Sequence, residues 1–465
     1  AEEAVTQLGL GVTEALITRL SRHSEIGVRP VTRHLQRHSA DDVAALGRGL
    51  GVKGVLDGTI QRLGDRVRVT MRLVRVRDGS VMSACQFDER LGDPLAVADT
   101  MSERITRALM LRLNADDQQR LRGQDTASMK AYHAYLKGRF FWERRTEESL
   151  NRGIVCFEQA IEEDPGYASA YLGLADCYHL LAYFGALSPA TCYPRVTAAA
   201  LKALEYDASL GVAHTTLGCV HLFYGWDAVQ AAREFHQALE LDPEHPRVHQ
   251  WSSQCSLAAG DVEAALRAME RARERDPMSV MVNTNIAIGL YYARRHDDSI
   301  AELRRAIEID PHFGIAHWAL GVNYEQKGAY DEAVRELQKG LTLSAPSVPM
   351  LSALGHVYGV SGRRAKARKI LDELRRLSSR RYVSPYCVGV VHAGLGDTDQ
   401  AFHWLQQAFD DRSTWLVYLG VDPTLDRLRS DRRFPELLRR IGLARDERLR
   451  TPARSLRRAA GVTPA

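Results

Sequence analysis

The chain has 465 residues, and its 62 Lys and Arg against 58 Asp and Glu give a formal net charge of +4. Hydrophobic residues make up 45% and charged residues 26%, a globular composition that excludes a disordered chain or a collagen-like fibre. This near balance of charge disfavours a protein that coats nucleic acid, and no apolar run reaches the roughly 18 residues that a membrane-spanning helix needs.

The first 124 residues lack any long period and predict a small α/β domain. Helical spacing of apolar residues predicts an amphipathic helix over 12–20 and a closing helix over 97–109. A short strand is expected at 26–31, and a capping-box pattern at 39–42 opens a second helix. The period then changes to two, which predicts three antiparallel strands: 55–61, 66–76 and 81–87.

Along the middle strand an apolar face alternates with a basic one. Arg66, Arg68 and Arg72 fall on the basic face. Two interpretations stay open: a surface that binds a small anion, or the solvated face of an antiparallel sheet, which is the commoner origin of such alternation.

From residue 125 to 415 the sequence repeats with a period of 34 residues. The repeating set is a Leu-Gly pair, a Tyr three residues later and a Gly four residues after that. It reads Leu320, Gly321, Tyr324 and Gly328 in one unit and Leu354, Gly355, Tyr358 and Gly362 in the next. The small residue lets two helices approach closely, and the last Gly ends the first helix in a left-handed conformation.

This pattern resembles the tetratricopeptide repeat and predicts about eight helical hairpins. The unit around Leu217 carries one extra residue near Tyr224, Gly225 and Trp226. The fold class expected for the chain is mainly α: a tetratricopeptide solenoid preceded by a small α/β domain with an antiparallel hairpin sheet. Such a solenoid binds extended or helical peptide segments on its concave face.

The positions expected on the concave face lie two residues before and two after the Leu of each unit. The candidate partner-binding residues are Thr215, Gln250, Gln254, Thr284, Trp318, Val322, Ser352, His356 and Tyr386. Cys219, Ile288 and Val390 hold equivalent positions, and none of the twelve is Lys or Arg. This disfavours a clamp for a C-terminal carboxylate and favours an internal peptide or a neighbouring domain. The alternative for each position is packing against the adjacent helix.

The C-terminal residues depart from the 34-residue period. Residues 416–443 are expected to form a helix, broken at Pro435, that caps the open end of the solenoid. Residues 444–465 are rich in arginine and are expected to form a disordered tail.

Residues 9–17, 50–60 and 66–70 resemble the TolB-like amino-terminal domain. The resemblance implies a bacterial signalling protein, because this domain precedes tetratricopeptide arrays in CadC-type winged-helix regulators, serine/threonine kinases and nucleotide cyclases. The apolar strand that usually opens the domain is missing here, so an upstream strand and an effector domain are expected before residue 1. The function implied is a non-enzymatic protein-protein interaction and regulatory module of a signalling or transcription-regulatory protein.

No residue pattern indicates catalysis, and no cofactor or metal site is predicted. The GxGxxG match at 49–54 runs from helix to strand, the reverse of the order that binds a dinucleotide. Seven scattered cysteines without a CxxC pair predict reduced, core-filling thiols. The expected partner is a protein or peptide, without direct nucleic-acid contact or a membrane span. A cytoplasmic location is expected, and a periplasmic sensor behind a missing membrane segment is the alternative.

Two functional alternatives stay open beside the interaction module. One is an anion sensor that acts through the three sheet arginines. The other is the regulatory half of a serine/threonine kinase or a nucleotide cyclase.

Overall fold

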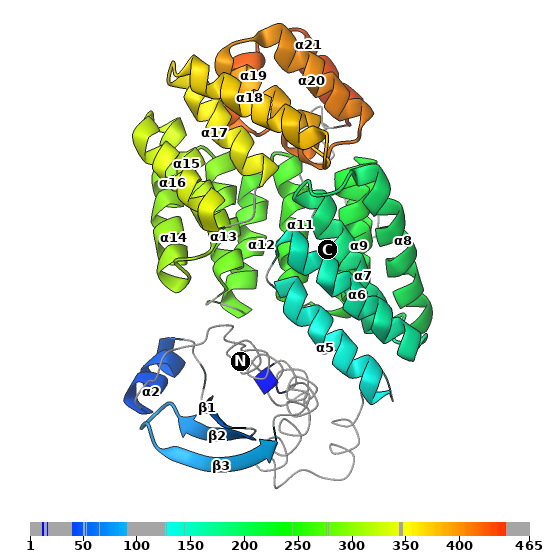
Figure 1. The fold of residues 1–465 in the computed structure, drawn as a ribbon, viewed down its shortest axis with the longest axis vertical. Coiled ribbons are helices and arrows are strands. Elements are labelled where there is room, and N and C mark those ends of the chain that lie inside the picture. Colours follow the sequence, from blue (N-terminus) through cyan, green and yellow to red (C-terminus); the bar gives the residue numbers. More distant parts are fainter. Residues whose placement is uncertain are drawn as a thin grey trace, which may run out of the picture. The chain divides into compact units, whose positions relative to one another are not determined.

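The computed structural model describes residues 40–49, 54–64, 66–90, 128–143, 145–243, 245–275, 279–343 and 347–442, with the single positions 12, 13, 16, 52, 126 and 277. The chain divides into two compact units, which are described separately (Figure 1). The first consists of Ala1–Arg144 and Val155–Ala170, and the second of Arg145–Ile154 and Tyr171–Ala465. The expected strand at 26–31, the closing helix at 97–109 and the tail at 444–465 lie outside the described residues.

The first unit contains a three-stranded antiparallel sheet in the order β1-β2-β3. Helix α2 (Ala40–Gly49) leads into β1 (Gly54–Leu63), so the GxGxxG match does run from helix to strand. β2 (Arg66–Arg75) is the central strand and pairs on its other side with β3 (Val81–Arg90). The two-residue alternation of β2 buries Val67, Val69 and Met71 on one face, as the sequence predicts.

The first unit also holds α5 (Met129–Glu143), which packs against the second half of α6 (Glu147–Glu163). Ala134 and Ala160 are buried where the two helices meet. A Cβ on Gly138 would lie 2.6 Å from the Phe157 ring, so only glycine permits this approach. Small residues at the crossing therefore set the spacing of this helix pair.

The second unit is a series of antiparallel helix pairs in which each pair packs on the next. The pairs are α7 (Ala168–Tyr183) with α8 (Pro189–Tyr206), α9 (Gly211–Val220) with α10 (Ala228–Leu241), α11 (Pro246–Ala258) with α12 (Val262–Arg275), α13 (Val280–Tyr292) with α14 (His296–Ile309), α15 (Gly314–Gln326) with α16 (Tyr330–Leu343), α17 (Val348–Val360) with α18 (Arg364–Ser378), and α19 (Pro385–Leu395) with α20 (Thr398–Asp410). First helices such as α13 carry almost no charge, because they are covered on several sides, whereas second helices such as α14 are amphipathic.

The 34-residue template has the physical roles expected from the sequence. A Cβ on Gly321 would lie 2.6 Å from Leu337 Cγ and 3.1 Å from the Ala333 carbonyl oxygen, so α15 and α16 touch at this glycine. Gly328 has φ of +75°, where a side chain is strained, and it follows α15. One unit earlier Arg294 occupies the same template position with φ of +63°.

The extra residue near Tyr224 is absorbed by a single π-helical turn, η1 (His221–Gly225), which continues α9. A π turn adds one residue to a helix without breaking it. Trp226 then takes a left-handed conformation with φ of +54° and ends the helix. The repeat therefore keeps its packing although its length differs by one residue.

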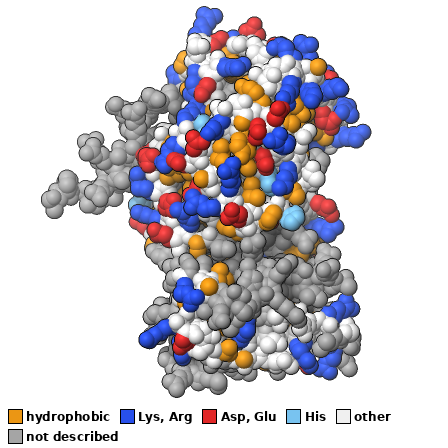
Figure 2. Space-filling model, turned by 90° about the vertical axis from the view of Figure 1, so that its left-hand side faces the viewer, with side chains coloured by type: hydrophobic (Ala, Val, Ile, Leu, Met, Phe, Trp, Pro, Cys, Tyr) orange, Lys and Arg blue, Asp and Glu red, His pale blue; other side chains and the backbone are white. Residues whose placement is uncertain are grey.

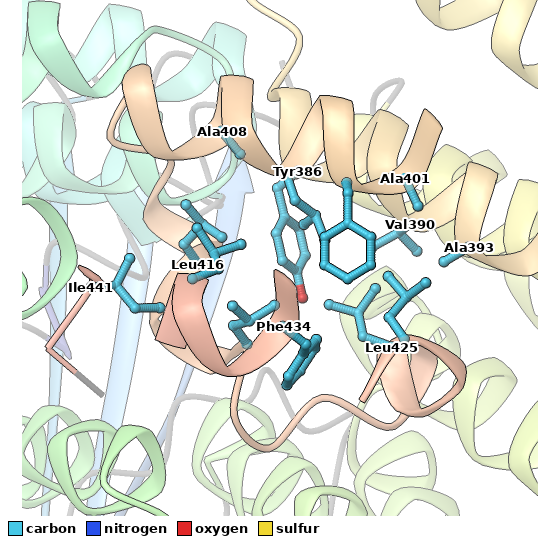
Figure 3. Packing of buried hydrophobic residues seen from close by; sticks show 14 residues of the cluster. Tyr386, Val390, Ala393, Ala401, Ala408, Leu416, Leu425, Phe434 and Ile441 are labelled. Atoms are coloured by element: carbon cyan, nitrogen blue, oxygen red, sulfur yellow. The ribbon is translucent and has the colours of Figure 1, made fainter. Parts of the chain in front are cut away.

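Residues 411–442, called the return segment below, follow α20 and depart from the hairpin pattern. They form the 3-10 helices η2 (Thr414–Tyr418) and η3 (Pro423–Leu428) and the short helix α21 (Arg433–Arg440). Pro435 is the third residue of α21, where its missing N–H removes no helical hydrogen bond, so it does not break this helix. Figure 3 shows Leu425, Phe434 and Ile441 of this segment packed toward Tyr386 and Val390 of α19.

Candidate functional site

The return segment binds the first helices of earlier repeats through hydrogen bonds to predicted groove residues. The Tyr418 hydroxyl donates to Gln254 Oε1 of α11 at 2.7 Å. His356 of α17 bonds through Nε2 to the Thr424 carbonyl oxygen at 3.0 Å. Residues far apart in the sequence are thereby joined along the face that the repeats were expected to offer to a partner.

Aromatic contacts extend this attachment. Trp415 donates from Nε1 to the Tyr183 carbonyl oxygen of α7 at 2.9 Å, and its ring meets Trp318 of α15 edge-on with centroids 5.9 Å apart. The Tyr418 ring stacks on Tyr292 of α13 at 5.3 Å with an interplanar angle of 14°. The segment therefore contacts α7, α11, α13, α15 and α17, all of them first helices of their pairs.

A pocket lies between the return segment and these first helices. Its empty space is about 760 Å³, open mouth included. Seven aromatic side chains share its lining: Tyr183, Phe184, Trp251, Tyr292, Trp318, Trp415 and Tyr418. Burial raises the pKa of Tyr183 to about 12, so its hydroxyl stays neutral at physiological pH. Polar lining comes from Gln250, Gln254, Asn285 and Ser347, and Arg145 adds a charged side chain.

A buried acid–base pair lies at the contact between α15, α17 and the return segment. His356 Nδ1 forms a short hydrogen bond with Glu325, and both side chains are buried. Burial alone would lower the pKa of His356, but the Glu325 carboxylate, with Asp422 and the Thr424 carbonyl, raises it above its ordinary value. The Tyr386 hydroxyl donates to Asp422 Oδ2 at 2.5 Å, which adds a second polar attachment at this place.

A second buried ion pair joins α7 to α11. Asp176, with 2% of its surface exposed, holds the Arg247 guanidinium through both carboxylate oxygens. His179 lies one turn further along α7, and its ring meets Trp251 edge-on with centroids 4.8 Å apart. Burial and the charges of Arg247 and Arg145 lower the pKa of His179 to about 3, so its ring is neutral.

The structure divides the nine predicted groove residues into three groups. Gln250, Gln254 and Trp318 line the pocket. His356 and Tyr386 are buried under the return segment. The other four, all buried, satisfy their own helix or pack within the array: Thr215, Thr284, Val322 and Ser352.

The pocket rings that sequence analysis missed lie on or next to first helices (Tyr183, Phe184, Trp251 and Tyr292) or in the return segment (Trp415 and Tyr418). Tyr292 is one helical turn beyond Ile288, which also lines the pocket, so extending each helix face by one turn would have found it. Trp415 and Tyr418 lie in the return segment, outside the repeat. The signal there was the apolar run Trp-Leu-Val-Tyr-Leu at 415–419, which directly follows the polar residues 411–414.

The predicted basic face of the sheet carries ion pairs. Arg68 holds Asp88 with a shortest distance of 2.7 Å, and Arg72 holds Asp57 at 2.8 Å. Arg66 donates to the Asp88 carbonyl oxygen at 3.4 Å. Each of these arginines therefore has an acceptor on a neighbouring strand, and anion binding by this face stays a prediction.

Figure 2 shows basic and acidic side chains interspersed over the coloured surface that faces the viewer, with hydrophobic side chains between them. A search of the described helices found none that is long and apolar enough to cross a membrane. All seven cysteines are free thiols, and Cys177, Cys192, Cys219 and Cys387 are buried. In the described part of the chain, no three His, Cys, Asp or Glu side chains are placed to hold a metal ion.

The stacked helix pairs form a tetratricopeptide solenoid. Comparison with known protein families supports this fold class. Two family models, both described as tetratricopeptide repeat, match residues 227–282 and 284–348. The chain therefore contains tetratricopeptide repeats, and the predicted fold class is confirmed. The resemblance of the first residues to a TolB-like domain stays a prediction.

Two curated bacterial relatives are regulatory or signalling proteins by name. Putative adenylate cyclase 3 of Rhizobium meliloti is 27% identical over 168 residues, which is 36% of this chain and 28% of that protein. Transcriptional regulator HilA of Salmonella typhimurium is 22% identical over 310 residues, which is 65% of this chain and 54% of HilA. The chain thus spans about a quarter to a half of the length of these relatives.

Solved structures of repeat proteins are similar to parts of the chain. YrrB, described as a TPR protein with an unusual peptide-binding site, is 24% identical, with a TM-score of 0.27 over 40% of this chain and 91% of YrrB. The human IFIT1 dimer with PPP-AAAA is 19% identical, with a TM-score of 0.44 over 68% of this chain and 79% of IFIT1. These likenesses concern the fold alone.

Proposed function

We propose that this chain is the protein-binding, regulatory part of a bacterial signalling or transcription-regulatory protein. The tetratricopeptide repeats make it a protein-protein interaction scaffold, since such arrays bind peptide or protein partners. The bacterial regulatory setting is supported by the relatives HilA and putative adenylate cyclase 3. In this proposal the chain has no catalytic activity of its own and controls an effector domain in the same protein, in the cytoplasm.

The observation that carries the proposal is the attachment of the return segment to the first helices. Gln254, His356 and Tyr386 each bind a backbone or side-chain group of residues 418–424. These side chains are therefore oriented to hold a polypeptide, with aromatic rings between them. A partner segment of similar chemistry, with aromatic side chains three residues apart and a carboxylate following, would compete with the return segment for this face.

Site-specific crosslinking tests the proposal. A photoreactive residue at Gln250, on the pocket wall, should capture the partner in living cells, and the same residue at Leu201, 54% exposed on α8, should not. The captured protein is then purified and its affinity measured by calorimetry. Trp318→Ala should weaken it at least about tenfold, because an aromatic anchor at an interface carries that much free energy.

The matched control is Val229→Ala, at a 55% exposed position on α10. Its affinity for the partner should equal that of the unaltered chain. Equal affinity of the Trp318 variant would place the partner elsewhere and contradict this use of the groove.

The effector class is a separate part of the proposal. We expect the coding sequence directly before Ala1 to encode a winged-helix domain or a cyclase or kinase domain. A winged-helix domain would make transcription the output of the protein. A cyclase domain would make it the synthesis of a cyclic nucleotide, and a kinase domain would make it phosphorylation. Reading that sequence distinguishes these outcomes, and any unrelated coding sequence there would remove the regulatory setting while leaving the interaction function intact.

A further inference from the structure

A strongly basic surface lies on helix α18, outside the groove. This helix has six basic and two acidic side chains, whereas α16 has two basic and three acidic ones and α20 has two acidic ones and neither Lys nor Arg. Ala367 and Leu374 are buried toward the array, so the opposite face of the helix is open to solvent. The exposed basic side chains of α18 are Arg364, Lys366, Arg368, Lys369, Arg375 and Arg376.

The repeat template predicts an acidic first turn for this helix. Positions 34 residues apart hold an acid in the second helices of four repeats and Ala365 in α18. The four acids are Glu263, Asp297, Asp331 and Asp399. Each lies at the positive end of its helix dipole and forms an ion pair with a basic residue further along the chain. In α18 the next residue is Lys366, which opposes the dipole. The helix therefore lacks a stabilising feature of its neighbours, a departure that proteins show at functional sites.

Within the described residues, part of this charge has no carboxylate to balance it. No ion pair there involves Arg368 or Lys369. Arg375 and Arg376 pair with residues three positions earlier on the same exposed helix. Exposed pairs of this kind contribute little in water, so the carboxylates of a partner can replace them at small cost. The face therefore offers four basic side chains to a partner.

The spacing of these four side chains matches an α-helix laid along α18. Arg368 and Arg375 are seven positions apart, as are Lys369 and Arg376, so each pair spans two helical turns, about 10 Å. A second helix with two adjacent acids in every seven residues presents its carboxylates with the same period. Arginine binds carboxylates through two parallel N–H donors, which favours such pairing.

Asp372 lies between the two ends of the basic face and argues against a nucleic-acid partner. A duplex has a phosphate charge about every 1.7 Å along its axis, so its backbone would bring phosphates against the carboxylates of Asp372 and Glu373. A polypeptide can place a neutral or basic side chain there, because its charges follow its sequence.

We propose that the outer face of α18 binds an acidic helix of a partner protein. Carboxylates of that helix pair with Arg368 and Arg375 on one side. They pair with Lys369 and Arg376 on the other side, and a basic side chain of the partner faces Asp372. None of these residues lines the groove pocket, so this is a second interaction surface whose chemistry differs from that of the aromatic groove. It holds its partner whether or not the groove is occupied.

A pair of peptides tests the chemistry of the partner. The first consists of three repeats of Glu-Glu-Ala-Ala-Lys-Ala-Ala, long enough at about 20 residues for partial helix formation, and the second has Gln in place of every Glu. Both carry fluorescein, and their binding to the full chain is followed by fluorescence anisotropy at about 50 mM salt, where screening is weak. The glutamate peptide should saturate one site and bind at least about tenfold more tightly than the glutamine peptide. No saturation below about 1 mM, or equal binding of the two peptides, would overturn the proposal.

Paired substitutions locate the bound peptide. Arg368→Gln combined with Lys369→Gln should weaken binding of the glutamate peptide about tenfold or more, because two charged contacts are lost. The matched control is Arg267→Gln combined with Arg271→Gln, which removes the same charge from exposed positions of α12. It should change the affinity by less than about twofold. Equal weakening by both double variants would show that the peptide follows net charge alone and would contradict the site. All four positions are exposed, and circular dichroism and urea midpoints verify that each variant is folded.

Two further probes distinguish other polyanions. They are a fluorescein-labelled DNA duplex of about 20 base pairs and phosphatidylcholine vesicles with about 30% phosphatidylserine. At about 150 mM salt, neither should bind the unaltered chain more tightly than the double variant of Arg368 and Lys369. Tighter binding of either one that depends on these two residues would assign the face to nucleic acid or to a membrane and refute the acidic helix.

A groove variant tests whether the two surfaces are separate. Trp318→Ala alters the groove wall and leaves α18 unchanged, so it should bind the glutamate peptide like the unaltered chain. Weaker binding by this variant would place the peptide in the groove. That result would refute the second surface and leave the proposed use of the groove intact.

Discussion

The regular repeats and the return segment are stabilised in different ways. In α15 and α16 a short periodic set suffices, because Gly321 at the helix crossing and the left-handed Gly328 after the first helix specify the hairpin. The return segment has no period, and single side chains such as Tyr418 and Trp415 hold it to several repeats at once. Substitutions should therefore act locally in the repeats and at several places together in the segment.

The largest effect is expected from Tyr418→Ala. This ring is 1% exposed, stacks on Tyr292 and donates to Gln254, so its removal leaves a cavity and an unpaired amide. The free energy of unfolding should fall by about 3–5 kcal/mol in urea denaturation. Tyr418→Phe, which keeps the ring, should cost only about 1 kcal/mol. Similar losses for both variants would mean that the hydroxyl, and not the packing, attaches the segment.

A glycine at a helix crossing should be less tolerant than one in the return segment. Gly321→Ala places a methyl group 2.6 Å from Leu337 Cγ and should lower the free energy of unfolding by about 2 kcal/mol. In Gly420→Ala the added methyl group contacts only Leu438 Cδ2, at 3.5 Å. This variant should change the free energy of unfolding by less than about 0.5 kcal/mol. Thermal unfolding of the two variants compares them, and an equal loss would contradict the role assigned to the crossing.

The return segment should be held less firmly as pH rises. The pKa of His356 is raised in the folded protein by Glu325, so its protonated form stabilises the fold. This contribution is complete below about pH 6.5, the ordinary pKa of histidine, and is lost as pH rises through the raised value. Tryptophan fluorescence during urea unfolding, repeated across this range, should report the decline. His356→Gln should remove this pH dependence, and a rise in stability with pH would refute the sign.

The smallest effect concerns Arg294, which stands where other repeats have glycine. Its φ of +63° is strained, but its guanidinium pairs with Asp426 of the return segment at 2.7 Å. In an Asp426→Asn background, Arg294→Gly should raise the free energy of unfolding by about 0.5 kcal/mol through relief of strain. With Asp426 present the gain should shrink, because the exposed pair is worth up to about 1 kcal/mol. Equal gains in both backgrounds would show that the pair contributes nothing.

The sequence alone predicted the elements whose cause is local. Gly328, Gly362 and Gly396 all have positive φ, as the template implies, and the alternation of β2 predicted its buried face. The 34-residue template also shows that the α9 unit has one extra residue. It does not show that this residue forms a π turn, because that depends on how α9 packs. Local rules extend no further than a few neighbouring residues along one element.

The pocket could be predicted only in part for the same reason. Gln250, Gln254 and Trp318 follow from the repeat register, because each lies on a first helix. The repeat register does not predict Trp415, because this residue lies outside the repeats. Its contacts are with Tyr183, 232 positions earlier in the chain, and with Trp318, about 100 positions earlier. The only sign of these long-range contacts in the sequence is an apolar run. A helix that caps the end of the solenoid would produce the same run.

The attachment of the last helix pair to the turn between α9 and α10 has a mechanical consequence. Arg412 donates to the Tyr224 carbonyl oxygen at 2.9 Å, and Trp226 packs on Phe409 with centroids 5.2 Å apart. An open array of helix pairs lengthens elastically when its ends are pulled apart, because each pair can rotate slightly against the next. Here any such extension must first break these contacts between the α9–α10 pair and the α19–α20 pair. The array should therefore stay rigid at small pulling forces. It should lengthen in one step once the contacts of Arg412 and Trp226 break.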